Sequence, residues 1–317
     1  MEEAGRAIAE ARSVALACHV GPDGDALGSM IGLGLAAETA GKQVIASYGS
    51  PYGDLGNLAF LPTDLLVPPS EFPEAPELMV VLDVGSADRL GELASNAANA
   101  KKLVVLDHHV TNEGFGDVSV VDPSAAATGE LVYDLLVLLG WPIEPTIAQC
   151  LHTALVTDTG RFTYSNTTPR TLEIGAALMT AGANPTEIGR HVYEEFPFGY
   201  LKAASVALQR SELDEDRRLV STFITHDDLK SAGVDWGDID NLIDAVRMAA
   251  EADTAVLAKV HDDGRVKVSM RSRGDTDVGG LAASMGGGGH RLAAGFTASD
   301  PVDKVLAAII ESIEDFR

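Results

Sequence analysis

The chain has 317 residues, of which 47 are acidic and 23 basic, so its formal net charge is −24. This charge argues against long nucleic acid as a partner, which normally needs a broad basic face, but an anionic small molecule held by metal ions and a few arginines remains compatible with it. The length predicts about two domains. The chain has two cysteines, and we find neither a signal peptide nor an apolar run long enough to cross a membrane. These features predict a cytoplasmic protein that is not bound to a membrane.

Residues 1–185 alternate strand-like apolar runs with helix-like stretches, which predicts an α/β domain with a mainly parallel sheet flanked by helices. The expected strands lie at 14–18 and 44–48 and at the runs that begin with Met79, Leu103 and Val118. Helices are expected at about 26–40, at 128–139, from Pro145 to near Asp158, and at 169–181. Thr128 is the expected N-cap of the second helix, because threonine hydroxyls bind the free amides of a helix start.

The rest of the chain is predicted to hold a helical connector at 186–212, broken near Pro197, and a smaller mixed α/β domain at 213–317. The pattern from Leu219 indicates a strand, two helices, two strands and a last helix at about 301–315.

Metal-binding side chains follow four of the apolar runs in the first domain. An aspartate after a strand is most often a cap or turn former, but four such segments in one sheet-like half favour a metal site at the carboxyl ends of the strands. Imidazole and carboxylate donors without thiolates suit Mn²⁺, Mg²⁺, Fe²⁺ or Co²⁺ better than structural zinc. The expected ligands are His19, Asp23, Asp25, Asp83, His108 and Asp158.

Carboxylates held this close repel one another, so the cluster is reasonable only with two divalent cations, between which Asp83 is the expected bridge. Two ions about 4 Å apart activate a water and clamp a phosphoryl group for in-line displacement. His109 can polarise the phosphoryl oxygen or protonate the leaving group, and Asp107 can orient an imidazole. His109 and Asp107 are therefore the expected catalytic residues.

A second feature lies in the smaller domain, where residues 265–273 alternate with period two and contain no acidic residue. Arg265 and Lys267 fit a solvated strand face, whereas Arg271 and Arg273 lie at the end nearest a glycine run and are expected to contact phosphate. Four consecutive glycines alone are a weak signal and more often form a flexible loop. Together with the arginines, a nucleotide-binding cradle is the better interpretation, formed by Gly286, Gly287, Gly288, Gly289 and His290.

These motifs resemble those of the DHH phosphoesterase superfamily. The matching segments are His19-x-x-Pro-Asp-Gly-Asp-Ala-Leu-Gly-Ser29, Asp83, Asp107-His108-His109 and Asp158-Thr159-Gly160. The segment from Gly286 to Phe296 resembles the signature of the associated DHHA1 domain. By size and domain content the chain is similar to the small nanoRNase and phosphoadenosine-phosphate phosphatase branch, whose actinobacterial members also cleave cyclic di-adenylate.

The resemblance implies two Mn²⁺ ions, one held by His19, Asp23 and Asp83, the other by Asp25, Asp83, His108 and Asp158. It implies an active site in the cleft between the two domains, in which His109 faces the scissile phosphate. Arg271, the glycine run and His290 would bind the nucleotide end. Arg273 is the residue in this set whose position tolerates other basic residues.

The implied activity is Mn²⁺-dependent hydrolysis of RNAs of two to five nucleotides to nucleoside 5′-monophosphates, and of 3′-phosphoadenosine 5′-phosphate to AMP. One alternative is a phosphodiesterase that acts mainly on cyclic di-adenylate and gives pApA and then AMP; nothing in the residues ranks cyclic above linear substrate. A catalytically silent nucleotide sensor is the alternative from another class, and it would be expected to lack one or more metal ligands. A homodimer is expected from the resemblance alone.

Overall fold

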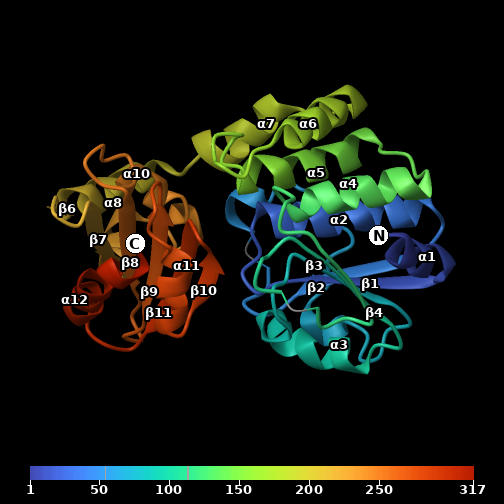
Figure 1. Cartoon of the computed structure of the whole chain (residues 1–317), viewed down its shortest axis with the longest axis horizontal. Helices are drawn as coiled ribbons and strands as arrows, with labels where there is room; N and C mark the ends of the chain where they lie inside the picture. Colours follow the sequence, from blue (N-terminus) through green and yellow to red (C-terminus); the bar gives the residue numbers. More distant parts are fainter. Residues whose placement is uncertain (54, 113) are drawn as a thin grey trace. The chain divides into compact units, whose positions relative to one another are not determined.

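The computed structural model describes residues 1–53, 55–112 and 114–317, which divide into two units, Met1–Glu194 (unit 1) and Glu195–Arg317 (unit 2). Figure 1 shows both along the chain, and each is described by itself. Within the described ranges, none of the helices combines the length and apolarity that crossing a membrane requires.

Unit 1 is built on a five-stranded sheet in the order β2-β1-β3-β4-β5, and every neighbouring pair is parallel. The parallel sheet expected for this half of the chain is therefore confirmed. Its central strands are buried on both faces, which explains their continuous apolar runs. The strands are β1 Ser13–Cys18, β2 Gln43–Tyr48, β3 Met79–Leu82, β4 Leu103–Asp107 and β5 Val118–Val121.

Helices cover both faces of this sheet. In Figure 1, α2, α4 and α5 lie on one face and α3 on the other. The first face packs the larger apolar core, and the second packs a smaller one around β3 and β4. The unit 1 helices are α1 Glu2–Glu10, α2 Gly24–Thr39, α3 Ala94–Asn99, α4 Thr128–Leu139, α5 Pro145–Asp158, α6 Pro169–Ala181 and α7 Pro185–Gly189, with 3₁₀ turns at Gly56–Leu58, Pro69–Glu71 and Ala87–Leu93 and a π turn at Arg190–Glu194.

Helices α2 and α5 pack against each other through small residues. A β-carbon built on Gly28 of α2 would lie 2.4 Å from the Cys150 carbonyl oxygen of α5 and 3.1 Å from the Ala154 amide nitrogen. Only glycine permits so close an approach of two backbones. This contact holds the start of α2 near the end of α5, the two helix ends that carry Asp25 and Asp158.

Replacement of Gly28 by valine is expected to lower the free energy of unfolding by about 1–3 kcal/mol, because the added methyl groups force the two helices apart. Denaturant unfolding of the metal-free protein measures this change. Gly189→Val is the matched control, because no atom lies within 4 Å of a β-carbon at that position, and it should cost less than about 1 kcal/mol. Equal losses in the two variants would show that the close approach is not what Gly28 provides.

Unit 2 contains a six-stranded mixed sheet in the order β10-β11-β9-β8-β7-β6, in which only β7 and β8 are parallel. The mixed α/β domain expected here is therefore confirmed. Two apolar cores fill its two faces, one beneath α8, α9 and α10 and the other beneath α11 and α12. The elements are α8 Phe198–Gln209, β6 Glu212–Asp214, β7 Leu219–Thr225, α9 His226–Ala232, α10 Leu242–Val246, β8 Thr254–Val260, β9 Val266–Ser272, α11 Val278–Ser284, β10 Gly288–His290, β11 Ala293–Ala298 and α12 Val302–Ser312, with 3₁₀ turns at Gly237–Ile239 and Ile313–Phe316.

One local expectation needs correction, and several short elements of unit 2 were not predicted. Thr128 is not the N-cap of α4; Ala127 holds that position without a side-chain hydrogen bond, and Thr128 is the first helical residue. The last two residues of the glycine run, Gly288 and Gly289, belong to β10, which pairs antiparallel with β11. The sequence pattern also did not predict the short elements β6, α11 and β11 of unit 2, whose apolar periodicity is too brief to detect.

Candidate metal centre

Three neighbouring strands of unit 1 end at one edge of the sheet and carry polar side chains just beyond their carboxyl ends. His19 follows β1 and Asp83 follows β3, while β4 ends at Asp107 and is followed by His108 and His109. The strand order changes direction between β1 and β3, which is where open parallel sheets form their binding sites. The start of α2 and the end of α5 reach the same edge, so segments from five elements meet there.

One group of side chains surrounds His19. Its Nε2 atom lies 3.8 Å from Asp23 Oδ2 and 3.5 Å from Asp83 Oδ2, and its Nδ1 atom lies 3.1 Å from the Val20 carbonyl oxygen. Because a carbonyl can only accept, Nδ1 donates to it and carries a proton. Nε2 is therefore the ring atom of His19 that can bind a metal.

A second group surrounds His108 in the same way. Its Nε2 atom lies 3.7 Å from Asp25 Oδ2, 3.5 Å from Asp83 Oδ1 and 3.6 Å from Asp158 Oδ2. Its Nδ1 atom donates to the Ala125 carbonyl oxygen over 3.1 Å. The ring is thus held with Nε2 among three carboxylates.

Asp83 takes part in both groups, with Oδ2 toward His19 and Oδ1 toward His108. Its backbone φ is 58°, in the left-handed region that side chains rarely adopt. Such strain costs about 1–3 kcal/mol and persists where the surrounding structure enforces it, often at functional sites. Asp83 is therefore the carboxylate that the fold positions between the two groups.

Asp107 is fully buried and contacts the side chains of His109 and Asn112. Its Oδ1 atom lies 2.7 Å from His109 Nδ1, and its Oδ2 atom accepts from Asn112 Nδ2 at 2.7 Å. These contacts fix the orientation of the His109 ring, whose side chain is 19% exposed. Asp107 thus holds the His109 ring through its Nδ1 atom.

Burial or the neighbouring charges raise the pKa values of four groups in the centre. Burial lowers the pKa of His19, but the hydrogen bond and charge of Asp83 and the charge of Asp23 outweigh it and raise the pKa to about 9. The pKa of His108 is also about 9, because three carboxylates outweigh its burial. Burial raises the pKa of Asp158 to about 7 and that of Asp25 well above its usual value. Both effects are typical of ligands that a bound cation would hold deprotonated.

The donor set fits divalent cations. In two groups, the nitrogen and oxygen ligand atoms all lie within 4.8 Å of one another: His19, Asp23 and Asp83, and Asp25, Asp83 and His108. Asp83, Asp107 and His109 form a third group by the same distance. Imidazole nitrogens with several carboxylate oxygens and no thiolate match Mn²⁺, Mg²⁺ or Fe²⁺. Unit 1 thus contains buried groups that can bind metal ions.

The residues expected to bind substrate lie in unit 2. Arg271 on β9 pairs with Ala293 on β11, and Ala293 pairs with His290 on β10. Directly paired residues point to the same face of a sheet, and two strand spacings separate Arg271 from His290 by about 10 Å. Arg271 and His290 therefore form one row on one face of this sheet.

The other expected substrate-binding residues have contacts within unit 2. Arg273 lies just beyond β9, and its guanidinium donates to the Ala249 and Ala252 carbonyl oxygens at 2.5 and 2.6 Å. A β-carbon on Gly287 would lie 2.2 Å from the Gly295 carbonyl oxygen. The close approach of the chain to itself therefore requires glycine at that position.

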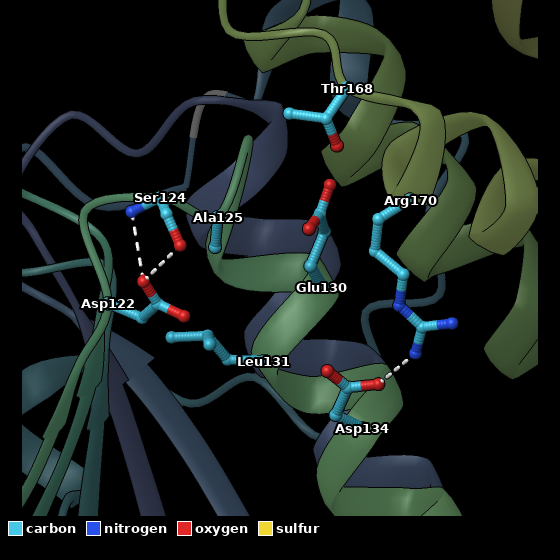
Figure 2. A pocket seen from close by; sticks show the side chains of 8 residues that line it. All are labelled: Asp122, Ser124, Ala125, Glu130, Leu131, Asp134, Thr168 and Arg170. Carbon is cyan, nitrogen blue, oxygen red and sulfur yellow. Dashed lines mark hydrogen bonds and ion pairs between the residues drawn. The ribbon is translucent and has the colours of Figure 1, made fainter.

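A separate pocket of about 290 Å³ lies between the segment after β5, α4 and the start of α6 (Figure 2). Three carboxylates and one arginine line it, and the arginine, Arg170, pairs with Asp134 at 2.5 Å. This acidic lining does not suit a phosphate, and none of the predicted site residues contributes to it.

Sequence reasoning missed the side chains that hold the expected ligands in place. The Ser29 hydroxyl donates to Asp25, and the Thr128 hydroxyl donates to Asp83. The Asn112 amide donates to Asp107. Ser29 lies within the motif that begins at His19, and Asn112 lies three residues after His109. Polar residues in or next to a motif were therefore the feature of the sequence that could have predicted these contacts. No comparable signal marked Thr128.

Comparison with known proteins agrees with the motifs. Residues 13–155 match the N-terminal domain of the DHH family, and residues 217–316 match the DHHA1 domain. The chain is 32% identical over 303 residues to the bifunctional oligoribonuclease and PAP phosphatase NrnA of Thermus thermophilus, covering 95% of this chain and 89% of that protein. It is 30% identical over 308 residues to NrnA of Bacillus subtilis, with 95% of each chain covered.

Two further similarities are weaker in sequence. The cyclic-di-AMP phosphodiesterase GdpP of Geobacillus thermodenitrificans is 27% identical over 340 residues, which cover 98% of this chain and 48% of that protein. A solved exopolyphosphatase-related protein of Bacteroides fragilis has a TM-score of 0.90 at 23% identity, covering 99% of this chain and 95% of that one, and it shows the shared fold. The resemblance noted from the motifs is thus confirmed, and the chain belongs to the DHH family, in the branch represented by the bifunctional oligoribonucleases and PAP phosphatases, with a DHHA1 domain as its second part.

Proposed function

We propose that this protein is a metal-dependent phosphoesterase that hydrolyses short oligoribonucleotides to nucleoside 5′-monophosphates and 3′-phosphoadenosine 5′-phosphate to AMP. The observation that carries the proposal is the buried carboxylate shared by two groups of metal-binding side chains, the arrangement around Asp83. Relatives at 30–32% identity over most of the chain bear the names of these two activities.

In the proposed roles, His19, Asp23 and Asp83 hold one cation, and Asp25, Asp83, His108 and Asp158 hold the other, Mn²⁺ in both cases. Such a pair of ions supplies an activated water and stabilises the charge that develops on the phosphoryl group. In hydrolysis the water oxygen bonds to phosphorus, the ester P–O bond breaks and the leaving oxygen takes up a proton. His109, held by Asp107, is proposed to supply that proton or to polarise the phosphoryl oxygen.

Unit 2 is proposed to bind the nucleotide through Arg271, the glycines 287–289 and His290. The row formed by Arg271 and His290 supports this role. Arg273 belongs to the same proposal with less support, because two backbone carbonyls already accept from its guanidinium. Residues 1–185, 186–212 and 213–317 are proposed as the catalytic domain, connector and substrate-binding domain.

The function is tested by a product time course with purified protein and Mn²⁺ on pApA, cyclic di-adenylate and 3′-phosphoadenosine 5′-phosphate. We expect AMP to form from pApA and from 3′-phosphoadenosine 5′-phosphate. A protein that leaves both of these substrates intact would refute the proposal. Binding of both nucleotides without turnover would instead favour a sensor.

A second candidate is a phosphodiesterase that acts mainly on cyclic di-adenylate, which the similarity to GdpP supports. The same time course separates the two functions. A higher kcat/KM for cyclic di-adenylate than for pApA would favour the second candidate, whereas the first predicts the reverse order.

Replacement of Arg271 by alanine is expected to raise KM for pApA about 10–100-fold with little change in kcat, because a charged hydrogen bond contributes about 1.5–3 kcal/mol. Arg271→Lys should recover part of the loss. Arg265→Ala is the control: this arginine precedes the same strand, is 62% exposed and pairs with Asp263. An unchanged KM in Arg271→Ala would mean that the side chain does not contact substrate.

The proposal includes a cytoplasmic homodimer. Light scattering coupled to gel filtration tests the assembly, and a mass of one chain at micromolar concentration would contradict it.

A further inference from the structure

Thr128 occupies an unusual place for a threonine at a helix start. It is fully buried, and its hydroxyl does not cap α4. Instead, Thr128 Oγ1 donates to Asp83 Oδ1 over 3.1 Å, across 45 positions of the chain. The hydroxyl therefore contacts the carboxylate that belongs to both metal-binding groups.

The backbone of the same residue contacts a second expected ligand. The Thr128 amide donates to Asp25 Oδ2 at 2.6 Å, and the Gly129 amide donates to Asp25 Oδ1 at 2.9 Å. The first amides of a helix have no partners within it, and the helix dipole favours a negative charge beside them. Asp25, which comes from α2, thus occupies the position at the start of α4 that an N-cap side chain normally fills.

These contacts hold two buried carboxylates that repel each other. Asp25 and Asp83 both lie within 4 Å of His108 Nε2, and Ser29 Oγ adds another donor to Asp25 Oδ1 at 2.9 Å. Hydrogen bonds from neutral donors stabilise the charged form of a carboxylate and fix its orientation. Of the three donor residues, Thr128, Gly129 and Ser29, Thr128 donates to both carboxylates, through its amide to Asp25 and through its hydroxyl to Asp83.

We propose that Thr128 is a positioning residue that sets the orientation of Asp83 relative to Asp25 and thereby the metal affinity of the group around His108. This inference rests on the metal-dependent function proposed above. It assigns to Thr128 no contact with substrate. The hydroxyl is the part that can be removed alone, because valine keeps the shape of the side chain and the backbone amide that binds Asp25.

The test compares Mn²⁺ binding to metal-free wild-type, Thr128→Val and Thr128→Ser proteins by calorimetric titration, together with thermal unfolding of the metal-free forms. Thr128→Val should weaken binding of one ion about 10–100-fold, the usual effect of removing a hydrogen-bond partner of a metal ligand. Thr128→Ser should restore most of the affinity, because it returns the hydroxyl.

Thr153→Val is the matched control for the loss of a buried hydroxyl. Thr153 is also fully buried, and its hydroxyl donates only to the Gln149 carbonyl oxygen of its own helix. Its Mn²⁺ affinity should stay within about threefold of wild type, whatever its unfolding temperature.

Unchanged Mn²⁺ affinity in Thr128→Val, absence of rescue by serine, or a wild-type protein that binds no Mn²⁺ would overturn the inference. Turnover of pApA by the wild-type protein is measured in parallel. An active wild type with unaltered binding in Thr128→Val refutes the role of Thr128 alone. A wild type that binds Mn²⁺ but converts no substrate, with weakened binding in Thr128→Val, refutes the proposed function alone.

Discussion

Replacement of Asp83 by asparagine is expected to lower kcat/KM by about 10³-fold or more and to remove most of the bound metal. Asp83 has one oxygen 3.5 Å from His19 Nε2 and the other 3.5 Å from His108 Nε2, so its loss affects both groups at once. A bound cation contributes several kcal/mol to stabilisation of the transition state, and each 1.36 kcal/mol is a factor of ten in rate. Metal analysis of the purified protein and steady-state kinetics with pApA measure the two effects.

Asparagine is the appropriate replacement because it keeps the size of the side chain and tolerates the left-handed backbone conformation at this position, where φ is 58°. The variant therefore removes charge without adding strain. Asp88→Asn is the control, because Asp88 is an exposed carboxylate five residues further along the chain. If Asp83→Asn kept its full metal content, the proposed sharing of Asp83 would be wrong.

Replacement of His109 by alanine is expected to lower kcat about 10²–10⁴-fold, the usual contribution of a general acid or base. Metal content should stay close to that of wild type, because the ring bonds to Asp107 at 2.7 Å and the proposed ligand sets do not include it. Asp107→Asn should reduce kcat as well, since it removes the carboxylate that orients the ring. Steady-state kinetics and metal analysis on the same preparations test both statements.

His226→Ala serves as the control, since His226 begins helix α9 of unit 2 and belongs to no metal-binding group among the described residues. The contrast between His109 and Asp83 is the informative result. Equal loss of metal in His109→Ala and Asp83→Asn would assign His109 to the ligands, as the third group of side chains, Asp83, Asp107 and His109, allows. Loss of activity without loss of metal supports the separate role of His109.

Much of unit 1 was predictable because its signals are local. Buried parallel strands are continuous apolar runs, and the residues that follow them, such as His19 and Asp83, emerge at one edge of the sheet by topology alone. Short strands and helices of unit 2 were missed because three to seven residues carry too little periodicity. The motifs identified candidate metal ligands, which periodicity cannot do, and the resemblance to the family was recognised from these motifs.

The amino-acid sequence by itself determined the class of fold, the family and the residue types of the metal centre. Asp107 was expected to orient an imidazole, and the structure shows that the ring it bonds to is that of His109. Only the tertiary structure decided that Asp25 lies at the start of α4 and that Thr128 binds Asp83 instead of capping its own helix. The physical reason is that a hydroxyl or amide bonds to whichever acceptor the fold brings within reach. For Thr128 that acceptor lies 45 residues away in the chain, a distance at which local propensity carries no information.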